Sequence, residues 1–160
     1  MIKKIISGGQ TGVDQAGLDA AIDLNIAYDG FIPKGRKSED GIVDEKYNLK
    51  ELKTASYPAR TRKNVSISDG ILVIKHEGKT TPGTTLTHKT AVELKKPVYL
   101  YLISEIKDEV DSEKFNNWIL DHRIKNLMIA GPRESHKPIY DRAREILTTL
   151  LQPYATKRKV

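Results

Sequence analysis

The sequence lacks cysteine and long hydrophobic runs, and each absence excludes a class of protein. Without cysteine the chain cannot form disulfides, carry a thiolate nucleophile or bind a metal through sulfur. No apolar stretch approaches the roughly 20 residues of a membrane-spanning helix. The first apolar run, Ile5-Ile6, gives way to glycines too early for a secretory signal peptide. We therefore expect a cytoplasmic protein that makes no contact with a membrane.

Sequence motifs of metal sites and hydrolases are also absent. No two of the four histidines stand at i, i+4 around an acidic residue, so we expect no structural metal. No serine occupies a G-x-S-x-G sequence, which excludes the nucleophile elbow of α/β-hydrolases. Among the acidic residues, Asp14 is the most interesting candidate for catalysis.

Positive charge is in excess, because 27 lysines and arginines face 21 aspartates and glutamates. The net charge of +6 fits an anionic partner, either a phosphate-bearing small molecule or nucleic acid. It fits equally well a basic surface that serves solubility. Part of the excess belongs to the C-terminal segment 153–160, which we expect to be a frayed basic tail.

The most informative stretch is the glycine-rich turn Ser7–Asp14, which follows a short apolar strand and opens a helical pattern. Glycines let the backbone approach a ligand closely, and a helix start offers unpaired N–H groups and a positive dipole end. Thr11 and Asp14 fit a capping box with Thr11 as N-cap, or Asp14 is a general base that faces a ligand. Alternatively, Ser7–Asp14 is a tight turn that binds no ligand. The stretch matches neither a Walker A loop nor a dinucleotide fingerprint.

Three further loops have a similar composition. Segment 80–85 combines Gly83 with threonine hydroxyls at a helix start. Segment 131–135 follows a strand and contains Arg133. Segment 33–37 sets cations beside a glycine, which suits phosphate contact or describes a solvated basic loop.

Apolar periodicity divides the chain into alternating strands and helices. Strands are expected at 3–6, 26–32, 70–74, 97–102 and 126–130. Helices are expected from about 13, 58, 86, 112 and 139, while 48–54 fits either a short helix or an irregular loop. This alternation predicts a single α/β domain, 1–160, built as a three-layer sandwich around a mainly parallel sheet of five or more strands.

The expected topology also predicts where a ligand binds. Right-handed crossovers place the carboxyl ends of all parallel strands at one edge of the sheet, where open α/β folds bind their ligands. The glycine-rich exits and the basic loops are therefore expected to gather at that edge. A single such loop could be structural, whereas several at one edge favour a binding site.

Five motifs of the chain resemble those of the putative molybdenum carrier family. They are ISGGQTGVD at 6–14, PKGR at 33–36, RTRKNV at 60–65, GTTLT at 83–87 and AGPRES at 130–135. That family is similar to the molybdenum cofactor carrier proteins. It is more distantly similar to a Rossmann-like group that includes cytokinin-activating phosphoribohydrolases and the DNA-processing protein A. The resemblance implies a Rossmann-like fold and a homo-oligomer.

The resemblance implies a carrier or sensor for a phosphate-bearing small molecule, with the molybdenum cofactor or a nucleotide as the ligand. The phosphoribohydrolases carry P-G-G-x-G-T-x-x-E, whose glutamate supports catalysis. Here the segment 82–89 reads PGTTLTHK, without the middle glycines and the acid. This favours binding over enzymatic turnover, with a nucleotide hydrolase and a nucleic-acid-binding module as alternatives.

The expected ligand-binding residues come from the glycine-rich loops, the basic loops and the RTRKNV motif. Arg60 and Arg62 diverge by about 200° on a helix, so one of them should face the ligand, and we predict Arg60. The full set is Ser7, Gly8, Gly9, Gln10, Thr11, Gly12, Asp14, Lys34, Gly35, Arg36, Arg60, Asn64, Gly83, Thr84, Thr85 and Arg133.

Overall fold

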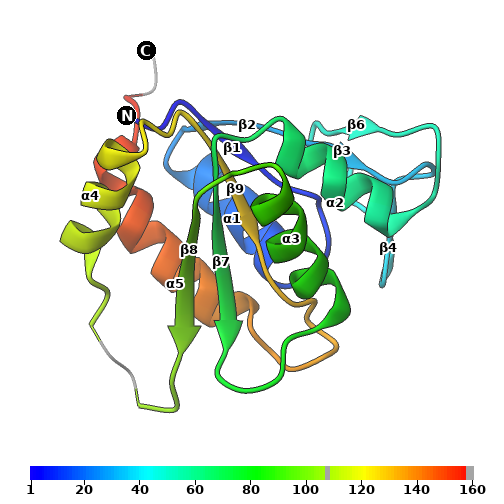
Figure 1. Ribbon diagram of the computed structural model, residues 1–160. Coiled ribbons are helices and arrows are strands. Elements are labelled where there is room, and N and C mark those ends of the chain that lie inside the picture. The colour runs from blue at the N-terminus through cyan, green and yellow to red at the C-terminus, as the bar shows by residue number, and fades with distance from the viewer. Residues whose placement is uncertain (107–108, 158–160) are drawn as a thin grey trace.

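The computed structural model describes residues 1–106 and 109–157 (Figure 1). Its central sheet has five parallel strands in the order β2-β1-β9-β7-β8. The strands are β1 (Lys4–Ile6), β2 (Ala27–Asp29), β7 (Gly70–His76), β8 (Val98–Ile103) and β9 (Asn126–Ala130). The helices are α1 (Val13–Asp23), α2 (Tyr57–Ser66), α3 (Pro82–Glu93), α4 (Ser112–Asp121) and α5 (Tyr140–Leu151).

Helices cover both faces of this sheet, with α1, α4 and α5 on one side and α2 and α3 on the other (Figure 1). Strand β7 shows why, because successive side chains of a strand point to opposite faces. Leu72 and Ile74 belong to the core beneath α1, α4 and α5, while Ile71 and Val73 belong to the core beneath α2 and α3. The predicted fold class is confirmed: a Rossmann-like α/β sandwich with a five-stranded parallel sheet.

The predicted second strand, 26–32, is interrupted at Gly30. This residue has φ +148°, and a Cβ built on it would lie 2.0 Å from the carbonyl oxygen of Ser7. The chain therefore leaves the main sheet after β2 and forms small two-stranded sheets instead. They consist of β3 (Phe31–Ile32), β4 (Lys37–Ser38), β5 (Gly41–Ile42) and β6 (Lys50–Glu51), in the pairs β3-β6 and β4-β5. The undecided segment 48–54 thus contains a short strand.

The helix starts differ from the sequence expectation in two places. The N-cap of α1 is Gly12, without a side-chain cap, so the predicted Thr11 capping box is wrong. Its residues have other partners, because the Asp14 carboxylate accepts from the Gln10 N–H and Thr11 Oγ1 bonds residues of neighbouring loops. Helix α3 is capped by Thr81, whose Oγ1 accepts from Thr84 N. Helix α3 therefore begins at Pro82, earlier than the expected start near residue 86.

The C-terminal segment is partly packed on the domain. After α5 a 3₁₀ turn, Gln152–Tyr154, buries the Tyr154 side chain. Thr156 then forms hydrogen bonds with Asn25, which follows α1. Residues 158–160 of the predicted frayed tail lie outside the described part of the chain.

Candidate ligand-binding site

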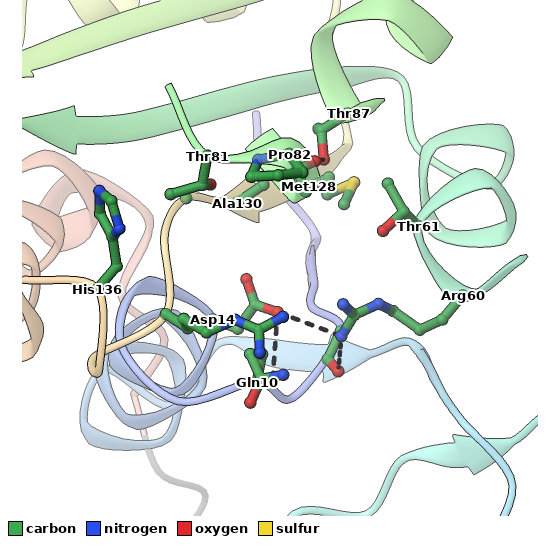
Figure 2. Close-up of a pocket in the computed structure, with 14 residues that line it drawn as sticks. Gln10, Asp14, Arg60, Thr61, Thr81, Pro82, Thr87, Met128, Ala130 and His136 are labelled. Carbon is green, nitrogen blue, oxygen red and sulfur yellow. Dashed lines mark hydrogen bonds and ion pairs between the residues drawn. The ribbon is translucent and has the colours of Figure 1, made fainter. Parts of the chain in front are cut away.

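A cavity of about 300 Å³ lies at the carboxyl ends of β1 and β9, beside the start of α3. Figure 2 shows Asp14 and Gln10 on one side of it and Thr81, Pro82 and Thr87 on the other. The lining residues are Gly8, Gln10, Asp14, Arg60, Thr61, Thr81, Pro82, Gly83, Thr87, Met128, Ala130, Gly131, Arg133 and His136. The sheet edge that the sequence indicated thus contains a cavity formed by the exits of two adjacent strands.

The first wall of the cavity is the exit loop of β1, residues 7–12, which the surrounding backbone holds closely. Gly12 has φ +79°, and a Cβ built there would lie 2.6 Å from the carbonyl oxygen of Pro132 in the β9 exit. Ser7 Oγ donates to the carbonyl oxygen of Asp14 and accepts from Gly9 N. Glycine is required at position 12 because L side chains rarely adopt this φ and no space exists for one.

Glu39, in the turn between β4 and β5, joins the two exit loops. It accepts hydrogen bonds from Thr11 Oγ1 and from Ser135 N, the latter at 3.1 Å. Thr11 Oγ1 also accepts from Glu134 N at 3.2 Å. Partial burial raises the pKa of Glu39, but the hydrogen bonds from Ser135 and Thr11 outweigh it and hold the pKa below its ordinary value. No sequence motif points to Glu39, which lies far from both loops along the chain.

Gln10 lines the cavity and has a buried donor without a partner. Its Oε1 accepts hydrogen bonds from Thr11 N and Glu39 N, each at 3.0 Å. These two bonds fix which end of the amide faces the backbone. The Nε2 group is buried and has no hydrogen-bond partner within the described residues, and the side chain is 5% exposed. A buried donor without a partner costs roughly 1–3 kcal/mol, so a ligand acceptor in the cavity would relieve that cost.

Arg60 reaches from α2 into the cavity toward Asp14 (Figure 2). Its Nη1 donates to the carbonyl oxygen of Gly8 at 2.7 Å and lies 3.6 Å from Asp14 Oδ2. Gly8 makes this approach possible, because a Cβ on it would lie 2.7 Å from the Arg60 side chain. Burial raises the pKa of Asp14 to about 6, although the Arg60 guanidinium and the bond from Gln10 N act in the opposite direction.

Three cations gather around the ring of Tyr57, the first residue of α2. Lys37 Nζ lies 4.6 Å from the ring centroid, and the guanidinium carbons of Arg60 and Arg133 lie 5.4 and 5.6 Å from it. Both arginines also line the cavity. Cation–π contact partly offsets the repulsion between like charges, so the ring helps to hold two guanidinium groups beside one site.

The structure separates the predicted residues into those that line the cavity and those that support it. Gly8, Gln10, Asp14, Arg60, Gly83 and Arg133 line it. Arg62, two positions from Arg60, is exposed and is not among the lining residues. Gly9 points elsewhere, since a Cβ on it would contact Ile32 and Leu49. Ser7, Thr11 and Gly12 shape the loop through the bonds described above.

The basic loop at 33–36 does not reach this cavity. The guanidinium of Arg36 donates to the carbonyl oxygens of Val43, Asp44 and Tyr47, and so closes its own loop. Lys34 and Gly35 are exposed, and neither is among the lining residues. The loop continues from β3, which has left the main sheet, and this displacement explains why its cations lie away from the cavity.

Three other predicted positions do not line the cavity. Asn64 is fully buried, and its amide bonds both the N–H and the carbonyl oxygen of Phe31, at 2.8 and 2.9 Å. It therefore ties α2 to β3. Thr84 and Thr85 lie within the first turn of α3 but are not among the lining residues, and Thr85 is exposed.

Sequence reasoning missed several lining residues. Most of them belong to strand ends and to the helices that face the cavity, and several stand inside the motifs quoted above without having been predicted as binding residues. They are Thr61, Thr81, Pro82, Thr87, Met128, Ala130, Gly131 and His136. Met128 and Ala130 alternate toward the α2 and α3 face of β9, so strand alternation near a predicted carboxyl end is the signal that could have found them.

The described residues contain neither a cluster of metal ligands nor a membrane-spanning helix. Residues 1–106 and 109–157 contain no group of three or more histidine, aspartate or glutamate side chains placed to hold a metal ion. None of the helices in these residues is long and apolar enough to cross a membrane.

Comparison with known proteins places the chain in a family. The family model described as the circularly permutated YpsA SLOG family matches residues 5–151. The chain belongs to the circularly permutated YpsA SLOG family. The match runs from β1 to the end of α5 and thus includes both exit loops of the cavity.

A solved relative supports this membership of the YpsA SLOG family. The chain is 45% identical to a protein from Syntrophus aciditrophicus SB whose crystal structure is named "Putative molybdenum carrier protein". The similarity covers 94% of this chain and 95% of that one, with a TM-score of 0.88. The resemblance to the putative molybdenum carrier family is thereby confirmed. Comparison with curated proteins gives no match.

Proposed function

We propose that this member of the circularly permutated YpsA SLOG family binds a phosphate-bearing small molecule in the cavity between the β1 exit loop and the start of α3. The ligand class is a nucleotide or the molybdenum cofactor, and the protein acts as its carrier or sensor. The name of the relative from Syntrophus aciditrophicus supports a carrier role. The groups that line the cavity favour an anionic ligand.

The observation that carries this proposal is the unpaired Nε2 group of Gln10. Gln10 lines the same cavity as Arg60 and Arg133, whose guanidinium groups suit phosphate oxygens. The start of α3 adds the positive end of a helix dipole at Pro82 and Gly83. Donors and positive charge from four separate segments, the β1 exit loop, α2, the β9 exit and the start of α3, thus line one space that favours an anion.

Gln10→Glu provides a sharp test of this arrangement. A glutamate keeps an oxygen for the Thr11 and Glu39 N–H groups and replaces the unpaired NH₂ group with an acceptor. We expect calorimetric titration to detect binding of a nucleoside monophosphate or a pterin phosphate to the wild type. The variant should lose at least about tenfold in affinity, which corresponds to about 1.4 kcal/mol.

Circular dichroism and thermal melting without ligand must first show that the variant is folded. Molybdate and inorganic phosphate serve as further probes, because they separate recognition of the anion from recognition of the organic group. If no phosphate-bearing probe binds the wild type at millimolar concentration, the proposed function is wrong. If binding occurs but is equal in the variant, the anion occupies another site.

A nucleotide hydrolase is the second candidate, and Asp14 is the observation that favours it. Its carboxylate lines the cavity, and its pKa of about 6 suits a group that exchanges protons near neutral pH. Asp14 would accept a proton from water as the water oxygen attacks C1′ of the ribose, and the base would leave with its glycosidic bonding electrons. Release of free base from a nucleoside monophosphate, lost in Asp14→Asn, would establish turnover.

Three expectations from the sequence stay predictions. The nucleic-acid-binding alternative predicts an affinity that falls by roughly 10³–10⁵ between 50 and 200 mM salt, if 6–10 phosphates are contacted. The homo-oligomer implied by the family resemblance predicts a mass above that of one chain in light scattering. The cytoplasmic location can be checked by cell fractionation.

A further inference from the structure

A second, basic cavity adjoins the first one at the carboxyl end of β7. Its volume is about 130 Å³, and its described lining residues include three lysines, two histidines and one glutamate. These are Lys75, Lys79, Lys137, His76, His136 and Glu77. The excess of lysines over carboxylates makes this space favourable for an anion.

The start of α3 lies between the two cavities. Thr81, its N-cap, and His136 line both of them. Pro82 and Gly83 face the first cavity, and Thr84 faces the second. The first turn of this 12-residue helix contains no acidic residue, so the positive end of its dipole is not neutralised locally.

The start of α3 is uncrowded at Gly83. A Cβ built on Gly83 would contact nothing within 4 Å, so the helix start is open at this point. The walls on either side are fixed by hydrogen bonds. Lys75 Nζ donates to the carbonyl oxygens of His76 and Gly78, at 3.2 and 3.0 Å, and His76 Nε2 lies 3.0 Å from the carbonyl oxygen of Pro138.

Two lysines of the second cavity carry charge that the described protein does not neutralise. Lys79 and Lys137 are exposed, and neither ammonium group pairs with a carboxylate within residues 1–106 and 109–157. They come from opposite sides of the space, Lys79 from the β7–α3 loop and Lys137 from the β9–α5 loop. An anion between them would therefore contact both loops.

We propose that the ligand carries two phosphoryl groups in series, as a nucleoside diphosphate does. One phosphoryl group lies in the first cavity with Gln10 and Arg60, and the next crosses the start of α3 to Lys79 and Lys137. This inference rests on the proposed function, since it assigns a second subsite to the same ligand. It names the diphosphate, rather than the base or the sugar, as the feature that distinguishes the ligand.

The test compares ADP with AMP by calorimetric titration of the whole protein. We expect the wild type to bind ADP at least about tenfold more tightly, since charge-assisted bonds to phosphate are the strong ones. The Lys79→Ala/Lys137→Ala double variant should lose this preference. Its affinity for AMP should change by less than about threefold, because AMP has no second phosphoryl group to contact these lysines. Pyrophosphate and phosphate form a parallel pair of probes without the nucleoside.

A matched control removes the same charge elsewhere. Lys89→Ala/Lys114→Ala replaces two exposed lysines that line neither cavity, and it should keep the preference for ADP. Equal binding of ADP and AMP by the wild type would overturn the second subsite and leave the proposed function standing. A preference that persists in Lys79→Ala/Lys137→Ala would overturn it as well. Failure of all four probes to bind would overturn both proposals.

Discussion

The two walls of the first cavity look alike in sequence and differ in structure. The β1 exit loop, 7–12, and the start of α3, 80–85, each combine glycine with hydroxyl residues at a helix start. The first wall is buried, and its loop packs against the backbone of the β9 exit. The second wall is open, since Gly83 and Thr85 are exposed. The same local pattern therefore forms a rigid wall where other loops pack on it and an open one where they do not.

Replacing one glycine in each wall with alanine should show the difference between the two walls most clearly, in the free energy of unfolding. Gly12→Ala forces a side chain into φ +79° and against Pro132, and we expect it to reduce the free energy of unfolding by about 4 kcal/mol. Gly83→Ala should instead raise it by about 0.4–1 kcal/mol, because the helical backbone accepts alanine and the unfolded chain loses entropy. Urea denaturation measures both. Similar losses in the two variants would contradict the contrast between the walls.

The first wall should also make stability depend on pH through Asp14. Its pKa is raised from 3.8 to about 6 in the folded protein, so the folded state favours the protonated carboxyl. The stability this contributes is fully present below pH 3.8 and is lost as the pH rises through about 6. The Asp14→Asn variant has no carboxyl group at this position, so it does not lose this stability as the pH rises. Its free energy of unfolding should therefore rise relative to the wild type by about 3 kcal/mol between pH 3.5 and pH 7.

Denaturant unfolding at several pH values measures this difference. Arg60, Arg133 and His136 also line the cavity near Asp14, so the same series in a His136→Gln background removes the imidazole from the comparison. A constant gap between Asp14→Asn and wild type at all pH values would show that burial does not perturb this carboxyl.

Two arginines of α2 offer a smaller and more selective contrast. Arg60 is buried against the first wall, whereas Arg62 is exposed. Arg60→Gln should lower the free energy of unfolding by about 2 kcal/mol, because the carbonyl oxygen of Gly8 loses its donor. Arg62→Gln should stay within about 0.5 kcal/mol of the wild type. Thermal melting without phosphate tests the structural role of Arg60, and melting with phosphate tests its role in anion binding. An equal response of the two variants would count against a specific role for Arg60.

The sequence by itself determined the layers of the fold and the edge at which the cavity lies. Apolar periodicity identified the five strands of the main sheet, because side-chain alternation and helical stripes are local properties of the chain. Helical geometry also indicated that only one of Arg60 and Arg62 faces the site, without deciding which. The interruption of the second strand at Gly30 was missed, since the constraint is a contact with the distant carbonyl oxygen of Ser7.

Only the tertiary structure decided which polar groups face the cavity. Arg36 and Arg60 both belong to basic motifs, yet Arg36 bonds the carbonyl oxygens of its own loop while Arg60 packs against Gly8. Gln10 is left with an unpaired donor because Glu39, 29 positions away along the chain, presents an N–H to its oxygen. A side chain binds whichever partner the folded backbone brings within reach, and that proximity is set by the packing of separate elements rather than by the residues next to it in sequence.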